Sequence, residues 1–241
     1  SGDDAFIEIS VPFSSFSDHW SPATGDQTTT CADDSSVCPT ASDLAGIKRV
    51  EIWAEGADGL VHLEIEAISA SLPAVTGVSA APPVLLAPVV LASPVMTAAD
   101  TIPLVTFGTN PDTDGFEFTE LNDPVMGGQS TGTWEVNSTG NFGIFDGEVK
   151  DVPSLSAPGF IKTAADGTFD DISAAFGGSL VLSVRSSTSD YQGFRVAFAA
   201  GATSSSYACS GGSSLPFSGG CFKAPFAFPS SLANSGDDAF I

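Results

Sequence analysis

Short hydrophobic runs separated by turn residues are the feature that most constrains the fold of this chain. No segment keeps the three-to-four-residue apolar period of an amphipathic helix over a helix-length window. Residues 61–68 alternate instead, with Val61, Leu63 and Ile65 set against polar neighbours, as in a half-buried strand. We therefore expect an all-β protein, built as a sandwich or jelly roll.

Further strands and turns follow from the same pattern. Strands are expected at residues 5–13, 50–53, 132–136, 142–149, 180–184, 194–198 and 221–228. Turn residues stand at Asn122–Pro124, Gly127–Gly128, Asp146–Gly147 and Gly177–Gly178.

Residues 72–106 differ from the rest and predict a linker. Proline recurs there among alanine, valine and leucine, which blocks helices and central strands and favours an extended chain. Because the segment is apolar, we expect it to lie on protein or beneath a coat of glycans, or to add an edge strand to a neighbouring domain. Candidate sites for hydroxyproline or O-linked glycans are Pro82, Pro83, Pro88 and Pro94.

The two ends of the chain carry the same heptapeptide, SGDDAFI. The second copy begins at Ser235, 234 residues after the first copy at Ser1. A tandem repeat of that period explains the match, and a duplicated tag or an overlap is the alternative. The expected organisation is then residues 1–71 as the C-terminal part of a β-sandwich unit, residues 72–106 as linker and residues 107–241 as the N-terminal part. Whether 1–71 packs with 107–241 of the same unit or of a neighbour stays open.

The four cysteines form two local pairs, Cys31 with Cys38 and Cys209 with Cys221. Neither spacing is that of a zinc knuckle, so disulfides and an oxidising, extracellular compartment are favoured. Three connectivities are open, and four reduced buried cysteines are the alternative.

The excess of acidic residues limits the kinds of partner that the chain can bind. With 29 acidic and 7 basic residues, the chain has a net charge of −22. Such a surface repels phosphate backbones and anionic lipids, so no nucleic-acid or membrane partner is expected. No cofactor is expected either, although the surface could hold calcium loosely.

One modification site and one turn stand out. Asn137-Ser138-Thr139 is an N-glycosylation sequon between two expected strands, where a hairpin tip would be exposed. The segment Asn122, Asp123, Gly127, Gly128 is read in two ways. Its glycines either let a ligand or partner approach the backbone or only satisfy a tight turn, and the second reading is favoured.

The residues that could carry other chemistry give weaker signals. Asp18, His19 and Trp20 suggest a sugar platform, with a core tryptophan as the commoner alternative, and Trp53 and Trp134 are expected in the core. No GxSxG elbow exists and neither histidine has an argued partner, so no catalytic residue is assigned.

Several blocks resemble the complex I intermediate-associated protein family. They are LNDPVMGGQSTGTWEV, FGIFDGEV and GFIKT, within residues 121–163, then YQGFRVAFAA from Tyr191 and GCFKAPFAFP from Gly220. Residues 7–20 and 44–68 resemble the family's final strands, although here they precede the linker. The resemblance implies a galactose-binding-like jelly roll without catalytic residues, in a family of assembly factors that bind other proteins.

The expected function is that of a structural repeat in a secreted, glycosylated fibre or cell-surface array, and not an enzyme. Its partners would be identical repeats and covalent glycans. A repeated carbohydrate-binding module and an intracellular protein-assembly factor are the alternatives.

Overall fold

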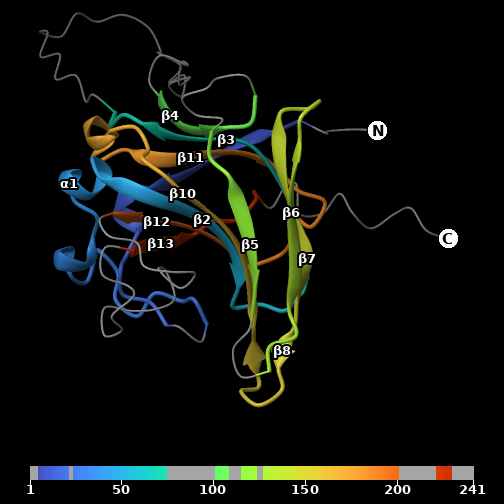
Figure 1. The fold of residues 1–241 in the computed structure, drawn as a ribbon. Helices are drawn as coiled ribbons and strands as arrows, with labels where there is room; N and C mark the ends of the chain where they lie inside the picture. Colours follow the sequence, from blue (N-terminus) through green and yellow to red (C-terminus); the bar gives the residue numbers. More distant parts are fainter. Residues whose placement is uncertain are drawn as a thin grey trace, which may run out of the picture.

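The computed structural model of the chain describes residues 5–21, 24–74, 101–108, 115–123, 127–200 and 221–229. Two antiparallel sheets face each other across one hydrophobic core in these residues, which confirms an all-β sandwich (Figure 1). Sheet A has the order β1-β11-β3-β7-β6, with β4 paired to β3, and sheet B has the order β13-β12-β2-β10-β5. The strands of sheet A are β1 (Ile7–Pro12), β3 (Gly59–Ser71), β4 (Thr101–Thr106), β6 (Thr131–Asn137), β7 (Phe142–Val149) and β11 (Ser179–Arg185).

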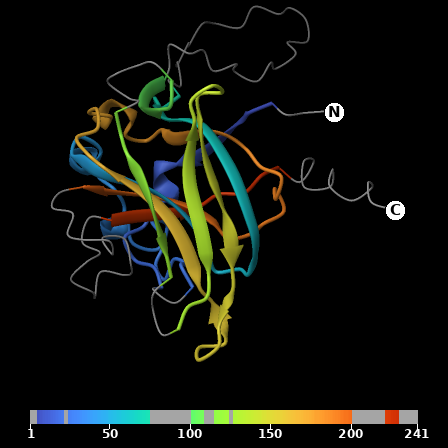
Figure 2. The same ribbon diagram turned by 45° about the vertical axis from the view of Figure 1, so that its right-hand side comes forward.

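Sheet B and a small hairpin complete the strands. Sheet B consists of β2 (Ile47–Glu55), β5 (Phe118–Asn122), β10 (Phe160–Asp166), β12 (Phe194–Ala200) and β13 (Cys221–Pro225). The short β8 (Asp151–Val152) and β9 (Ala157–Pro158) pair only with each other and project below β6 and β7 (Figures 1 and 2). Helical turns are α1 (Ala41–Leu44), η1 (Phe13–Ser15), η2 (Ser35–Val37) and η4 (Ser173–Ala175).

The alternation expected at residues 61–68 is present in β3 and is then shifted by a bulge. Val61, Leu63 and Ile65 are buried in the core, whereas Ile68 and Ala70 are the buried residues further along. The pairing with β11 skips Glu66, because Ser183 faces Ala67 and Val184 faces Ile65. One extra residue moves the inward positions from odd to even numbers, so both halves of β3 contribute to the core.

Strands from before and after the expected linker alternate within both sheets. In sheet A, β3 lies between β11 and β7, and in sheet B, β2 lies between β12 and β10. Residues 5–74 therefore supply a central strand to each sheet, and they pack here with residues 101–229 of the same chain. Without β2 and β3, the strands that follow the linker would form no continuous sheet.

The expected linker extends too far at its C-terminal end. Residues 101–106 form β4, which pairs with β3 so that Thr101 faces Ser71. Pro103 is accommodated because β4 pairs on one side only among the described residues and the ladder is irregular at this point. Residues 75–100, which include Pro82, Pro83, Pro88 and Pro94, lie outside the described residues.

One of the expected turns needs correction. Asp146–Gly147 is not a turn but lies inside β7, where Gly147 faces Gly132 of β6. These two glycines leave room for Ile161 of the opposite sheet, whose Cδ1 lies 2.5 Å from the position that a Cβ at Gly147 would take. By contrast, Gly177 does occupy a turn, with a φ of 84°.

Candidate functional site: a buried ionic cluster on sheet B

Basic side chains are few in this chain, and most of them are buried together. Four of the seven, Arg49, Lys162, Arg195 and Lys223, are at most 8 % exposed. Buried lysine and arginine are rare unless they are paired. We use the name buried ionic cluster for these four residues together with Glu51, Glu55, Trp20 and Trp53.

The strand period places the cluster on the face of sheet B that points away from the inter-sheet core. In β2, Val50, Ile52 and Ala54 enter the main core, so Glu51, Trp53 and Glu55 project to the other side. Trp53 faces Lys162 of β10 across one ladder and Arg195 of β12 across the other. A second, separate apolar cluster surrounds Trp53 on this face and contains Trp20, Ala197, Ala199 and Cys221.

Glu51 is a fully buried carboxylate that accepts several hydrogen bonds. Trp53 Nε1 donates to Glu51 Oε2 at 2.7 Å, and Lys162 Nζ donates to Glu51 Oε1 at 2.9 Å. Arg49 Nη1 lies 3.5 Å from Glu51 Oε1 and also binds the exposed Asp166. The hydrogen bond to Asp166 is the chief reason why the pKa of Arg49 is raised. Glu51 thus has the partners that a buried charge requires.

Lys223 contacts one carboxylate and two tryptophan rings. Its Nζ donates to Glu55 Oε1 at 2.5 Å, and the Lys223 side chain is fully buried. The same Nζ lies 3.5 Å from the ring centroids of both Trp20 and Trp53. Burial lowers the pKa of Lys223 to about 8, although the attraction of Glu55 opposes this shift.

The segment between β1 and β2 covers the cluster. Ser17 exchanges backbone hydrogen bonds with Lys223, and Gln27 Nε2 donates to the Lys223 carbonyl at 2.8 Å. Gly25, with a φ of 70°, packs directly on the Glu55 carboxyl group, where a Cβ would lie 2.2 Å from Cδ. In Figure 1 this blue segment lies beside β12 and β13. It shields both the outer face of sheet B and the edge of β13.

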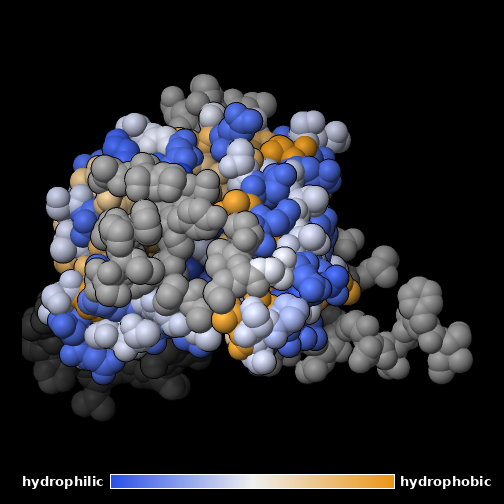
Figure 3. All heavy atoms as spheres, turned by 60° about the horizontal axis from the view of Figure 1, so that its bottom comes forward, coloured by the Kyte–Doolittle hydropathy of each residue, from blue (hydrophilic) through white to orange (hydrophobic). Residues whose placement is uncertain are grey.

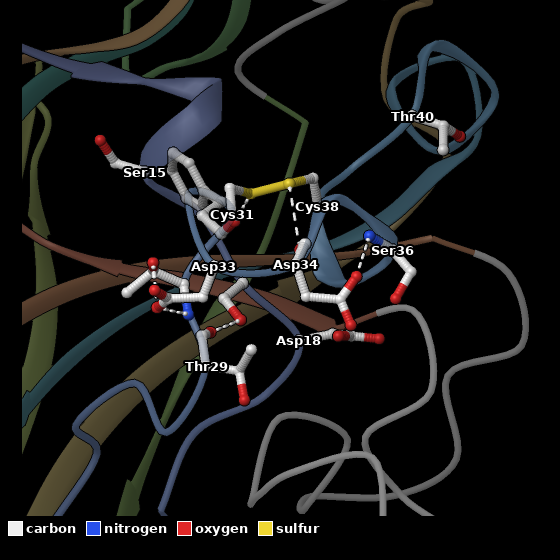
Figure 4. The surroundings of a disulfide bond; sticks show 12 residues. Ser15, Asp18, Thr29, Cys31, Asp33, Asp34, Ser36, Cys38 and Thr40 are labelled. Carbon is white, nitrogen blue, oxygen red and sulfur yellow. Dashed lines mark hydrogen bonds between the residues drawn. A yellow bond between two sulfur atoms is a disulfide. The ribbon is translucent and has the colours of Figure 1, made fainter.

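A disulfide and several local hydrogen bonds hold the covering segment. Cys31 and Cys38 are bonded, with their Cα atoms 5.3 Å apart, which is the local pairing expected from the sequence (Figure 4). Asp34 Oδ1 accepts from the Ser36 backbone N–H at 2.8 Å, and this bond lowers the pKa of Asp34. A capping box at Thr40 and Asp43 starts α1. Cys221 is also disulfide-bonded, whereas Cys209 lies outside the described residues.

The three tryptophans, which were expected to bind sugar or to fill the core, lie in two different parts of the sandwich. Trp20 and Trp53 are 2 % exposed, and both belong to the covered face of sheet B and not to the inter-sheet core. Trp134 is half-buried against Phe107 and Phe118 at the main core. Burial is the main cause of the raised pKa of Asp18, next to His19. Trp20 therefore offers no platform to a ligand from solvent.

The described residues of the DPVMGG segment and the neighbouring Asn122 make local contacts. Asp123 is 7 % exposed, and a Cβ on Gly128 would lie 2.4 Å from its Cγ. Asn122 Oδ1 accepts from the Gly132 backbone N–H at 2.6 Å, and Gly127 has a φ of 84°. Residues 124–126 lie outside the described part of the chain. Asp123 is thus buried, whereas Asn122 is exposed and holds the Gly132 backbone N–H.

Asn137 lies at the end of β6, at the turn that leads into β7. Its Oδ1 accepts from the Thr139 and Gly140 backbone N–H groups at 3.1 and 2.9 Å, and Asn141 follows with a φ of 59°. Residues 138–141 are exposed. The turn lies at the opposite end of these strands from β8 and β9 (Figure 1), so the sequon occupies an open hairpin tip.

The sequence analysis did not identify the buried ionic cluster. A signal was present, because Arg49, Glu51 and Glu55 alternate with apolar residues in β2 and would suit an exposed strand face. Nothing in that pattern reveals that residues 13–46 fold back over it. Strand period alone therefore does not predict the burial of these charges.

The remaining surface is mainly hydrophilic. The large exposed apolar side chains among the described residues are Leu60, Leu72, Val136, Leu155 and Phe176. The face drawn in Figure 3 carries separate small hydrophobic areas, shown in orange, between hydrophilic ones. No group of three or more His, Cys, Asp or Glu side chains within the described ranges is arranged to hold a metal ion. No helix in this part of the chain is long and apolar enough to cross a bilayer.

Comparison with known proteins gives one match. The family model described as Complex I intermediate-associated protein 30 (CIA30) matches residues 105–210, a segment that runs from β4 to beyond β12. No curated protein and no solved structure matches the chain significantly. Residues 105–210 are therefore similar to the complex I intermediate-associated protein 30 family, in agreement with the resemblance seen in the sequence.

Proposed function

We propose that this chain is a structural repeat unit of a secreted, glycosylated fibre or cell-surface array, and that its sandwich is of the jelly-roll, galactose-binding-like type. The unit has no catalytic role in this proposal. The observation that carries it is the alternation in both sheets of strands from before and after the linker, taken together with the repeated heptapeptide at residues 1–7 and 235–241.

The strand order gives each unit two ways to be completed. Residues 5–74 fill the gap between β11 and β7 in one sheet and between β12 and β10 in the other. In a tandem chain with a period of 234 residues, a copy of residues 1–74 would begin at residue 235, so the same contacts would form within a unit or between consecutive units. Repeated units that share strands would resist separation.

The chemistry of the unit supports an extracellular setting. Cys31 and Cys38 form a disulfide, Cys221 is disulfide-bonded as well, and the Asn137 sequon lies at an exposed hairpin tip. Disulfides persist in oxidising compartments, where sequons are also modified. The net charge of −22 would keep neighbouring fibres apart.

Two alternatives have different support. The match to the CIA30 family at residues 105–210 favours a protein-assembly factor inside the cell. A carbohydrate-binding module would need an exposed aromatic platform, and the burial of Trp20 and Trp53 argues against one at those residues.

Mass spectrometry of non-reduced protein from its natural source tests the proposal. We expect a large, heterogeneous glycoprotein with Asn137 occupied. We also expect a peptide that reads from SSLAN through SGDDAFI into EISVPF, which only a tandem chain contains. A homogeneous, unglycosylated species near 24.4 kDa with four free thiols would contradict the fibre and support the assembly factor.

The two-segment completion has its own test. Residues 1–74 and 101–241 are produced as separate chains and mixed, and we expect them to associate into a folded β-protein detected by size exclusion and circular dichroism. As a control, the chain is instead divided at residue 182, inside β11. This cut interrupts the pairing of β11 with its neighbours on both sides, β1 and β3. If residues 101–241 fold alone, strand sharing between units is excluded.

A further inference from the structure

Two lysine–glutamate pairs lie in the buried ionic cluster, and their surroundings differ. Glu51 accepts from Lys162 and Trp53 and also contacts Arg49, so its charge is shared among several donors. Among the described residues, Lys223 is the one donor to the Glu55 carboxylate. Gly25 and the indoles of Trp20 and Trp53 enclose this pair.

We propose that Lys223 and Glu55 become joined by an amide bond, formed by the folded protein itself. The ammonium group of Lys223 first gives a proton to the Glu55 carboxylate, which produces a neutral amine and a neutral acid. The amine nitrogen then attacks Cδ of Glu55. The C–O bond breaks, and the hydroxyl group leaves with a proton from nitrogen as one molecule of water. One positive and one negative charge disappear, so the net charge of the chain is unchanged.

The geometry supplies the first requirement of this reaction. With Nζ 2.5 Å from Oε1, the nitrogen is in direct contact with the carboxyl group that it would attack. The lysine is also held in place, because Nζ is equally close to the two tryptophan rings. Holding two reactants in contact gives them a high effective concentration, equivalent to about 10⁵ M or more.

The exclusion of solvent supplies the second requirement. Both side chains are at most 7 % exposed, and an ion pair removed from water loses much of its advantage over the neutral pair. The pKa of Lys223, about 8 because of burial, brings the neutral amine within reach at ordinary pH. An amide formed here would also be protected from hydrolysis.

The position of the bond has a structural effect. Glu55 lies on β2 and Lys223 on β13, with β12 between the two strands. The bond would therefore link residues before the linker to residues after it and close sheet B across three strands. It does not depend on the repeat or on secretion, so it stands apart from the function proposed above.

The chain offers a matched control in an exposed pair. Lys150 Nζ lies 2.8 Å from Glu148 Oε2, and these side chains are 45 % and 44 % exposed. The functional groups and the distance are similar, but water stabilises both charges there. We expect this pair to remain ionic.

Intact mass spectrometry of the full, reduced chain tests the proposal. We expect a mass lower than the sequence mass by one water, and a branched peptide that joins Glu55 to Lys223. Lys223→Met should restore the full sequence mass, whereas Lys150→Met should keep the deficit. A wild-type chain of full mass, with Lys223 in a linear peptide, would overturn the proposal, and this result does not require any variant to fold.

A second readout uses the linker. A specific protease site inserted within residues 75–100 is cut in the folded protein, and the products are run on a reducing, denaturing gel. The amide predicts one band for the wild type and two bands for Lys223→Met. Two bands from the wild type would show that the pair is only ionic.

Discussion

Buried charges in this protein are stabilised by specific neighbours at the level of single residues. Glu51 has Trp53, Lys162 and Arg49 around it, and Glu55 has Lys223. Removal of one partner from such a pair costs about 3–5 kcal/mol, because the other charge stays buried. The cluster is therefore a place where single substitutions have large effects.

The raised pKa of Tyr191 predicts that the folded protein loses stability at alkaline pH. Its hydroxyl donates to the Ala57 carbonyl at 2.8 Å, and burial, followed by the charge of Glu55, raises its pKa. Below about pH 10 the tyrosine is protonated in both the folded and the unfolded chain. Above that pH the unfolded chain releases the proton first, so this contribution to folding falls as pH rises.

The variant Tyr191→Phe isolates this effect. At pH 7 it should lower the free energy of unfolding by about 1 kcal/mol, because the Ala57 carbonyl loses its donor. Between pH 9 and 11 the variant should lose less stability than the wild type. Urea titrations across this range provide the measurement, and equal losses in the two proteins would contradict the assignment.

Among the elements, β7 depends on small residues. Gly147→Ala would place a Cβ 2.5 Å from both Ile161 Cδ1 and the Thr131 carbonyl. We expect a loss of about 1–3 kcal/mol from overpacking between the sheets. Gly46→Ala is the matched control, since its nearest atom would be an ordinary 3.5 Å away. The free energy of unfolding of both variants is measured by denaturant titration. Equal losses in the two variants would show that the sheets can move apart to accept the extra methyl group.

The covering segment depends on its disulfide. The ring closed by Cys31 and Cys38 spans a sequence separation of 7. Replacement of both cysteines by alanine should cost about 2 kcal/mol, because the unfolded chain gains freedom. The loss should be smaller than that of the wild type after complete reduction, because reduction also breaks the disulfide of Cys221, and guanidinium unfolding provides the measurement. A variant as stable as the oxidised wild type would show that local hydrogen bonds alone hold the segment.

The strands show what sequence can and cannot predict. The bounds of β7 agree with the predicted residues 142–149, although a turn was also expected inside them at Asp146–Gly147, because Asp-Gly is a common turn sequence. β4 was missed because Pro103 reads as linker, although an edge strand tolerates proline at an irregular position. β2 extends beyond the predicted residues 50–53, since charged residues such as Arg49 and Glu55 obscured it. Their burial results from tertiary packing, which local patterns do not encode.

At the scale of the whole molecule, charge opposes compactness. A net charge of −22 on one sandwich favours the expanded chain through self-repulsion. Sodium chloride at 0.15 M or above shortens the Debye length to about 8 Å or less and should raise stability by about 1 kcal/mol, or about 3 °C in melting temperature. Calcium at equal ionic strength should add little beyond this if it binds only loosely. Thermal melts in matched salts distinguish the two, and a melting point that falls with salt would contradict net repulsion.

The placement of basic residues also decides how the protein meets proteases. Trypsin-like enzymes cut after lysine and arginine, and all seven of these residues lie in the described fold, with none in residues 75–100, 201–220 or 230–241. Four of the seven are sealed inside the buried ionic cluster. Proteolysis needs an accessible backbone at the cleavage site. The folded chain therefore has very few sites that trypsin-like enzymes can cut. It should be degraded slowly in any fluid where these are the main proteases.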